Sequence, residues 1–313
     1  MQIKKIIIKG LLFMVVVAAV YIAIMFLLVK VTIGGKPVVF RACDAVSWKG
    51  GNSYQKFIDF DTKKKYDILV LGSSHAYRGY DPRAFKNNNI DLFNLGTSGQ
   101  TPLSSYFISK NYINANSCKL VLLDIYDGAL SGDGVESTSD LIQNIGSTKA
   151  AVEMGLALED PRAINMLTVR MLIKNASPMY VDSAYVYNGY SEKRDSVKIV
   201  DKKWYDFTAK INTKQVRYLI KLISYFKENN IQVIMLTHPA PKEMNRENHK
   251  KFAEVVNFIA TEYAVEYWDY EFKHNLDSKN DFFDGHHLNQ SGVEKYNKML
   301  IDSLKERGYL PLK

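Results

Sequence analysis

Five short apolar runs are spaced along the chain, and helix-like segments separate most of them. The runs occupy residues 66–72, 91–94, 120–125, 231–236 and 265–268. Continuous apolar runs that are rich in β-branched residues are typical of parallel strands buried on both faces. We therefore predict that the five runs form the strands of one mostly parallel sheet.

Amphipathic segments between the runs predict the helices that cover this sheet. Thr101 and Pro102 are a favourable N-cap and first-turn pair for a helix to about residue 114. Further helices are expected at 213–229 and 245–263, and a last one, capped by Asn289 or Ser291, should end near Gly308. Strands that alternate with helices predict a flavodoxin-like, three-layer α/β/α fold.

The alternation is interrupted between about residues 128 and 210, which we interpret as an insertion into the core fold. Helical segments are expected there at roughly 138–149 and 161–174. The stretch 180–190 is rich in tyrosine and shows no clear period. Its rings could stack on a sugar or fill the core of a small subdomain.

Residues 10–29 carry no charged side chain and follow Lys4, Lys5 and Lys9. About 20 apolar residues suffice for a helix to cross the hydrocarbon core, and preceding lysines favour a cytoplasmic N-terminus. A signal anchor is preferred to a cleaved signal because no small-x-small cleavage site follows. We expect an anchor at 1–33, a juxtamembrane connector at 34–65 and an extracytoplasmic domain at 66–313.

The composition adds little to this picture. The chain has 313 residues and a formal net charge of +8, and its lysines are scattered or in short runs. This distribution indicates a solvated surface, not a nucleic-acid patch, and at most a weak preference for anionic polymers. The two cysteines, Cys43 and Cys118, could pair in an oxidising compartment or remain buried thiols.

Candidate chemistry lies where the first run ends, at Gly72-Ser73-Ser74. A hydroxyl in a tight turn after a parallel strand lies at the carboxyl edge of the sheet, where ligands bind in open α/β folds. Ser74 is our candidate nucleophile, although Ser73 is adjacent. A candidate base and its orienting carboxylate are His287 and Asp284, three residues apart and just before the last helix.

A serine after the first strand, followed near the C-terminus by Asp-x-x-His, is the chain order of the SGNH (GDSL-like) hydrolases, which this sequence resembles. Gly72-Ser73-Ser74 stands where the family usually has Gly-Asp-Ser. Residues 94–99, Asn-Leu-Gly-Thr-Ser-Gly, resemble its second motif. The resemblance implies that the N–H groups of Ser74 and Gly99 stabilise an oxyanion; Gly96 is a competing match for Gly99.

The third motif of the family, Gly-x-Asn-Asp, is absent. After the third run the chain reads Leu-Asp-Ile-Tyr-Asp-Gly at 123–128, so one oxyanion donor is missing or comes from elsewhere, and Asp127 is a structural candidate. His75, His238 and His286 are candidates for substrate binding. Asp284, His286 and His287 are also metal-ligand types, but we predict neither a metal nor another cofactor.

The resemblance implies acyl transfer through Ser74, His287 and Asp284. We expect a membrane-anchored esterase or O-acyltransferase that acts on a cell-envelope or exported polysaccharide, with envelope-biosynthesis proteins as possible partners and no nucleic acid. One alternative is an inactive binding or assembly protein of the envelope, which the absent asparagine favours. Another is a lipase or thioesterase, which would need an apolar acyl pocket.

Overall fold

The computed structural model describes residues 2–43, 49–173, 182–195, 210–244 and 246–310. Its central feature is a five-stranded sheet with strand order β4-β3-β5-β8-β9, all neighbours parallel. The strands are β3 (Tyr66–Leu71), β4 (Leu92–Asn94), β5 (Cys118–Asp124), β8 (Gln232–Thr237) and β9 (Glu266–Asp269). This is the flavodoxin-like order. The prediction of a three-layer α/β/α fold with five strands is confirmed.

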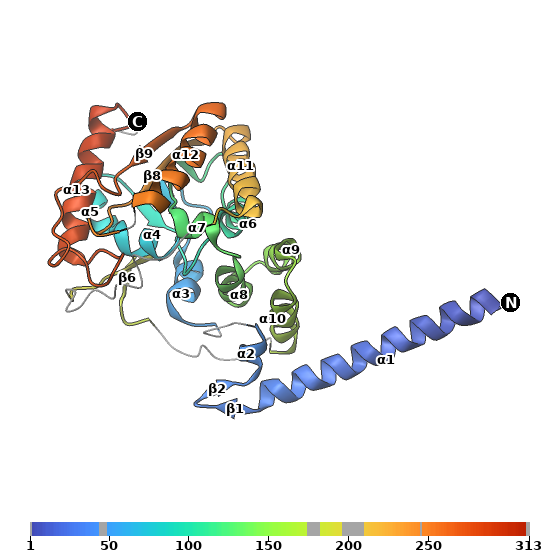
Figure 1. The fold of residues 1–313 in the computed structure, drawn as a ribbon. Coiled ribbons are helices and arrows are strands. Elements are labelled where there is room, and N and C mark those ends of the chain that lie inside the picture. Colours follow the sequence, from blue (N-terminus) through green and yellow to red (C-terminus); the bar gives the residue numbers. More distant parts are fainter. Residues whose placement is uncertain (1, 44–48, 174–181, 196–209, 245, 311–313) are drawn as a thin grey trace.

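Alternate residues of the strands enter two separate cores, one on each face of the sheet. On β3, Leu69 and Leu71 belong to one core, while Ile68 and Val70 belong to the other. The first core is covered by α6 (Pro102–Tyr112), α11 (Thr213–Glu228) and α12 (Arg246–Glu262), and the second by α4 (Ser74–Gly79), α5 (Pro82–Lys86) and α13 (Gln290–Glu306). Figure 1 shows α5 and α13 on the side of the sheet opposite α6 and α11. Burial on both faces explains why the strands lack polar alternation.

The region after β5 is helical, as expected, but it is divided differently. It contains α7 (Asp127–Ser131), α8 (Val135–Asn144), α9 (Thr148–Leu158) and α10 (Pro161–Leu172). The predicted end of the helix at 138–149 is wrong, because α8 ends at Asn144 and a new helix, α9, begins at Thr148. Ser147 caps the new helix by accepting a hydrogen bond from the N–H of Ala150.

The tyrosine-rich stretch contains a hairpin that the sequence analysis did not predict, formed by β6 (Tyr185–Tyr187) and β7 (Tyr190–Ser191). Asn188 and Gly189 have φ values of 44° and 86°, which are typical of a two-residue hairpin turn. Tyr190 is buried and donates a hydrogen bond to Gln290, so this ring fills a core. Residues 180 and 181 lie outside the described part.

The N-terminal helix α1 (Gln2–Lys30) is long enough to cross a membrane. Its most apolar stretch of 18 residues has a mean hydropathy of 3.0. It leads through β1 (Thr32–Ile33), β2 (Lys36–Pro37) and α2 (Val39–Cys43) to α3 (Gly51–Asp59). Lys56 on α3 is fully buried and donates to the carbonyl of Gly96. Cys43 and Cys118 are both buried free thiols.

His249 on α12 lies between two carboxylates, one at the end of β9 and one just after it. Its Nε2 is 2.9 Å from Oδ2 of Asp269, and its Nδ1 is 2.5 Å from Oε2 of Glu271. Burial lowers the pKa of His249, but its hydrogen bonds and ion pairs with the two carboxylates outweigh this and raise it to about 9. The stabilisation is therefore complete below the unfolded-state pKa of about 6.5 and is lost as the pH rises through 9.

We expect His249→Gln to lower the free energy of unfolding by up to roughly 3 kcal/mol at pH 6. The loss should be much smaller at pH 10, where the native imidazole is neutral. Chemical denaturation of both proteins in detergent at the two pH values measures this difference. An equal loss at pH 6 and pH 10 would show that His249 contributes by packing and not by charge.

Candidate active site

The turn between β3 and α4 places Ser74 at the carboxyl edge of the sheet. Gly72 has a φ of 144°, and a Cβ there would lie 2.6 Å from the carbonyl oxygen of Asp124, so this position requires glycine. The Gly72 N–H donates to Oε1 of Gln100 at 2.7 Å. Ser73 is the N-cap of α4 and accepts a hydrogen bond from the N–H of His75 at 3.3 Å. These contacts assign Ser73 to the turn and leave Ser74 as the first helical residue.

Ser74, His287 and Asp284 meet although more than two hundred residues separate the serine from the other two. Nε2 of His287 lies 2.7 Å from Oγ of Ser74, and Nδ1 of His287 lies 2.7 Å from Oδ2 of Asp284. The second oxygen of Asp284 accepts from the backbone N–H groups of His286 and His287 at 2.9 and 2.8 Å. The carboxylate thus holds both the loop and the ring in place.

The surroundings keep this imidazole neutral and its carboxylate charged. Burial lowers the pKa of His287, against the hydrogen bond and charge of Asp284, which raise it. Burial would raise the pKa of Asp284, but the hydrogen bond and charge of His287 hold it far below its usual range. Phe283 stacks on the His287 ring at 5.2 Å with an interplanar angle of 8°. A neutral, oriented imidazole beside a hydroxyl is the arrangement that a general base requires.

Three further histidines gather behind this set. His75 and His238 stack with ring centroids 3.7 Å apart, and Nε2 of His75 lies 2.7 Å from Nδ1 of His286. Burial and the neighbouring rings lower the pKa of His75 and bring that of His286 to about 3, so both rings are neutral at pH 7. His75 and His238 are 3% and 4% exposed. Of the three, His286 is therefore the best placed to meet a substrate, and binding by any of them stays a prediction.

Asp124, which the sequence analysis did not single out, stands at the end of β5, where the third motif would begin. It accepts a hydrogen bond from the Tyr80 hydroxyl at 2.7 Å, and its other oxygen lies 3.4 Å from Nδ1 of His238. The ring of Tyr126 meets His75 edge-on at 4.3 Å. The only sequence signal for Asp124 and Tyr126 is their position at, or just after, the end of a strand.

Two overlapping sets of side chains present metal-ligand atoms within 4.8 Å of one another. They are His75 with His286 and His287, and His75 with Asp124 and His238. His287 already bonds to both Ser74 and Asp284, and His75 bonds to His286. A cation bound by the first set would compete with the hydrogen bonds that His287 makes to Ser74 and Asp284. The prediction of a site without metal stays a prediction.

The second motif forms a tight loop against α4. The amide of Asn94 donates to the carbonyls of Ala76 and Tyr80, and its oxygen accepts from the N–H of Gly96. Gly96 therefore uses its N–H within the loop. Gly99 has a φ of 55°, and a Cβ there would lie 3.1 Å from the carboxyl carbon of Glu136. Among the described contacts none joins Gly99 to Ser74, so its oxyanion role stays a prediction.

Arg78 is a second residue that the sequence analysis missed. It lies four positions after Ser74 in α4, which is about one helical turn. Its guanidinium lies 5.1 Å from the rings of both Tyr77 and Phe283. Its positive charge also lowers the pKa of His286 and His287. Arg78 thus contributes to the neutrality of the candidate base.

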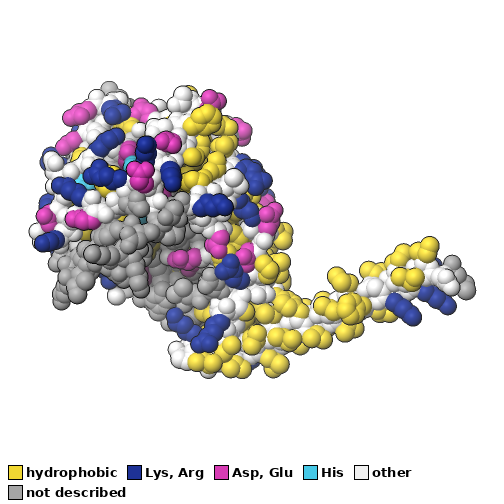
Figure 2. Space-filling view, in the orientation of Figure 1, with side chains coloured by type: hydrophobic (Ala, Val, Ile, Leu, Met, Phe, Trp, Pro, Cys, Tyr) yellow, Lys and Arg dark blue, Asp and Glu magenta, His cyan; other side chains and the backbone are white. Residues whose placement is uncertain are grey.

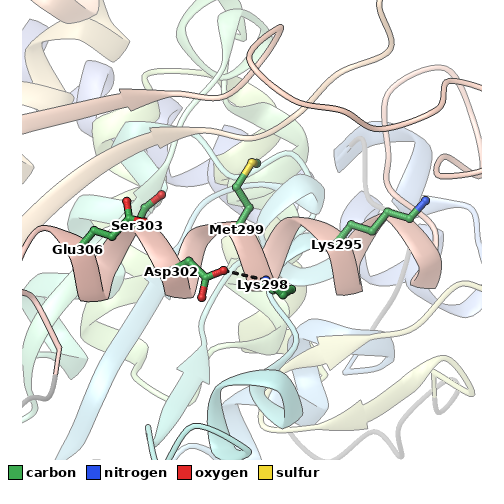
Figure 3. Close-up of a pocket in the computed structure, with 6 residues that line it drawn as sticks. All are labelled: Lys295, Lys298, Met299, Asp302, Ser303 and Glu306. Carbon is green, nitrogen blue, oxygen red and sulfur yellow. Dashed lines mark hydrogen bonds and ion pairs between the residues drawn. The ribbon is translucent and has the colours of Figure 1, made fainter.

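A surface hollow on α13 lies apart from these residues (Figure 3). All its lining side chains come from this one helix, and two of them, Lys298 and Asp302, form an ion pair of 2.9 Å. The lining residues are Lys295, Lys298, Met299, Asp302, Ser303 and Glu306. The hollow contains no residue of the serine–histidine set, and we assign it no role in the chemistry.

Comparison with known proteins gives matches to solved structures at low identity. A lipase/acylhydrolase from Enterococcus faecalis is 13% identical, with a TM-score of 0.41 over 77% of this chain and 96% of that chain. A GDSL-like lipase from Bacteroides thetaiotaomicron is 11% identical, with a TM-score of 0.41 over 82% and 98%. An esterase, EstA, from Pseudoalteromonas sp. is 13% identical, with a TM-score of 0.41 over 77% and 98%.

These three proteins are named as a lipase/acylhydrolase, a GDSL-like lipase and an esterase, and none bears on a membrane-anchored branch. One family profile matches residues 195–307, which include β8, β9 and the Asp284–His287 motif but less than half of the chain. No curated protein matches the chain.

Proposed function

We propose that this protein is a serine-dependent acyl esterase or O-acyltransferase of the SGNH (GDSL-like) type. The observation that carries the proposal is the continuous hydrogen-bonded chain from Ser74 through His287 to Asp284, with 2.7 Å at both steps. Nucleophile and base within hydrogen-bond reach, with the base oriented by a third group, are the signature of nucleophilic catalysis.

In the proposed reaction Nε2 of His287 accepts the proton of Ser74 as Oγ attacks an ester carbonyl. Asp284 keeps Nδ1 protonated and stabilises the imidazolium that forms. His287 then returns the proton to the leaving alcohol, and the acyl group stays on Ser74. Water or a sugar hydroxyl, deprotonated by the same imidazole, attacks this acyl group, and the imidazolium returns the proton to Oγ of Ser74 as the ester bond breaks. The two acceptors distinguish an esterase from a transferase.

We further propose that the protein works at a membrane and that its substrate is a cell-envelope or exported polysaccharide. The apolar helix α1 supports the first part, and the family resemblance supports the second. A catalytically inactive envelope protein is the second candidate, because Asp124 stands where the family places its oxyanion motif. Loss of one such donor typically costs about 100- to 1000-fold in rate.

A fluorophosphonate probe separates the two candidates. An activated serine should be labelled covalently, and peptide mass spectrometry should place the adduct on Ser74. The same preparation should hydrolyse a small acetyl ester such as 4-nitrophenyl acetate. Folded protein without an adduct and without turnover would favour the inactive candidate.

The pH dependence of turnover should reflect the lowered pKa of His287. The base must be neutral, and a lowered pKa keeps it neutral at pH values below the usual histidine value of about 6.5. We expect the pH at which kcat/KM for an acetyl ester falls to half of its plateau to lie below 6.5. A midpoint above pH 6.5 would contradict this assignment of the base.

A further inference from the structure

Two helices of the insertion present apolar side chains to the outside. On α9, Val152 and Leu156 are 40% and 62% exposed, and on α10, Ile164 and Met171 are 52% and 65% exposed. The spacing of four and of seven residues places each pair on one face of its helix. We call these four residues the α9–α10 apolar face. Figure 2 shows hydrophobic side chains continuing from α1 onto this part of the domain.

Hydrogen bonds join α10 to the apolar helix α1. The hydroxyl of Tyr21 donates to Oδ1 of Asn165 at 2.8 Å and lies 3.3 Å from Oγ1 of Thr168. Ile164 and Met171 lie about one helical turn before and after Thr168. The exposed residues of α10 therefore flank its contact with α1.

The position of Tyr21 along α1 sets the height of this contact. The uncharged segment between Lys9 and Lys30 is about 30 Å long, and Tyr21 lies about 14 Å from its outer end. If this segment spans the hydrocarbon core, α10 meets α1 inside the bilayer. If α1 is shifted outward until Tyr21 reaches the interface, α10 still lies at the level of the headgroups.

The charged residues of both helices are mostly held by the domain. Arg170 donates to the carbonyls of Ile142 and Ile145, Arg162 pairs with Asp160, and Glu153 pairs with Lys110. Lys149 is exposed at the start of α9, where an ammonium group can reach lipid phosphates. The outer face is thus apolar with one exposed lysine at its edge, a pattern that fits an interfacial helix.

We propose that the α9–α10 apolar face lies in the outer leaflet of the lipid bilayer, beside α1. This inference depends on the proposed membrane location and goes beyond it, because an anchor alone would leave the domain free to tilt. With two contacts, the sheet and the Ser74 site are held at a fixed height above the membrane.

Depth measurements on the full chain in liposomes of phosphatidylcholine and phosphatidylglycerol test the proposal. Single cysteines at Leu156 and Met171 (L156C, M171C) carry a bimane label, and lipids with a doxyl group either near the headgroup or deep in the acyl chain quench it. Val17→Cys in α1 is the positive control, and Lys298→Cys on α13 is the exposed control. Cys43 and Cys118 are buried, and burial raises the pKa of each thiol to about 12, so the unsubstituted chain should label poorly.

We expect labels at positions 156 and 171 to be quenched at least about twofold more than the label at position 298. Quenching at position 17 alone would overturn the proposal and leave the anchor intact. No quenching at position 17 would overturn both. Labels at 156 and 171 that are protected from lipid while the protein crosslinks as a dimer would assign the face to a second copy, which also overturns the proposal.

Discussion

Replacing Ser74 with alanine should lower ester turnover by at least about 10⁴-fold and abolish labelling by a fluorophosphonate. The substitution removes the oxygen that is proposed to form the acyl-enzyme, while alanine is tolerated at the first position of a helix. Steady-state hydrolysis of an acetyl ester and gel-based labelling measure the two effects. Turnover that remains within tenfold of the original would refute Ser74 as the nucleophile.

Ser73→Ala is the matched control, because it removes a hydroxyl from the neighbouring position. Ser73 caps α4, so the variant should lose about 1 kcal/mol of stability and still be labelled. The two variants together decide which of the two adjacent serines is the nucleophile, a choice that the sequence motif left open. Labelling that is lost with Ser73 and kept with Ser74 would reverse the assignment.

Asp284→Asn should lower kcat by roughly 10³- to 10⁴-fold. The carboxylate accepts from Nδ1 of His287, whereas the amide that replaces it can present its N–H to that ring and favour the wrong tautomer. The fold should be retained, because one oxygen can still accept from the backbone N–H groups of His286 and His287. Stopped-flow or steady-state turnover, with circular dichroism as a check on folding, measures the effect.

Asp281 provides a control carboxylate in the same loop. It is buried, accepts from Nζ of Lys295 at 2.6 Å and from Oγ of Ser291 at 2.8 Å, and makes no described contact with His287. Asp281→Asn should therefore lower the melting temperature, with kcat of the folded protein within a few-fold of the original. Equal losses of kcat in both variants would indicate that the loop, and not the tautomer of His287, limits turnover.

The sheet could be predicted from the sequence because burial on both faces leaves continuous apolar runs. The contact of Ser74 with Asp284 and His287 could also be predicted. A hydroxyl directly after the first strand and an Asp-x-x-His spacing are both local patterns that can be recognised in the sequence. The family resemblance added the pairing between these distant motifs.

His75 and His238 were candidates for substrate binding, but their contacts with each other and with Asp124 could not be predicted. Asp124 ends β5, and His75 and His238 follow β3 and β8, so these contacts depend on the strand order β3-β5-β8, which no local pattern encodes. The hairpin at Asn188 and Gly189 was missed for another reason. Its strands are too short for a period to be visible, although an Asn-Gly pair is itself a turn signal.

The buried side chain of Lys56 has a practical consequence for protein production. It ties α3, which precedes the sheet in the chain, to the carbonyl of Gly96 in the loop that packs against α4. A soluble version cut immediately before β3 would leave that carbonyl without its donor and open a void beneath Tyr77. Expression clones meant to retain chemistry should therefore start upstream of Gly51.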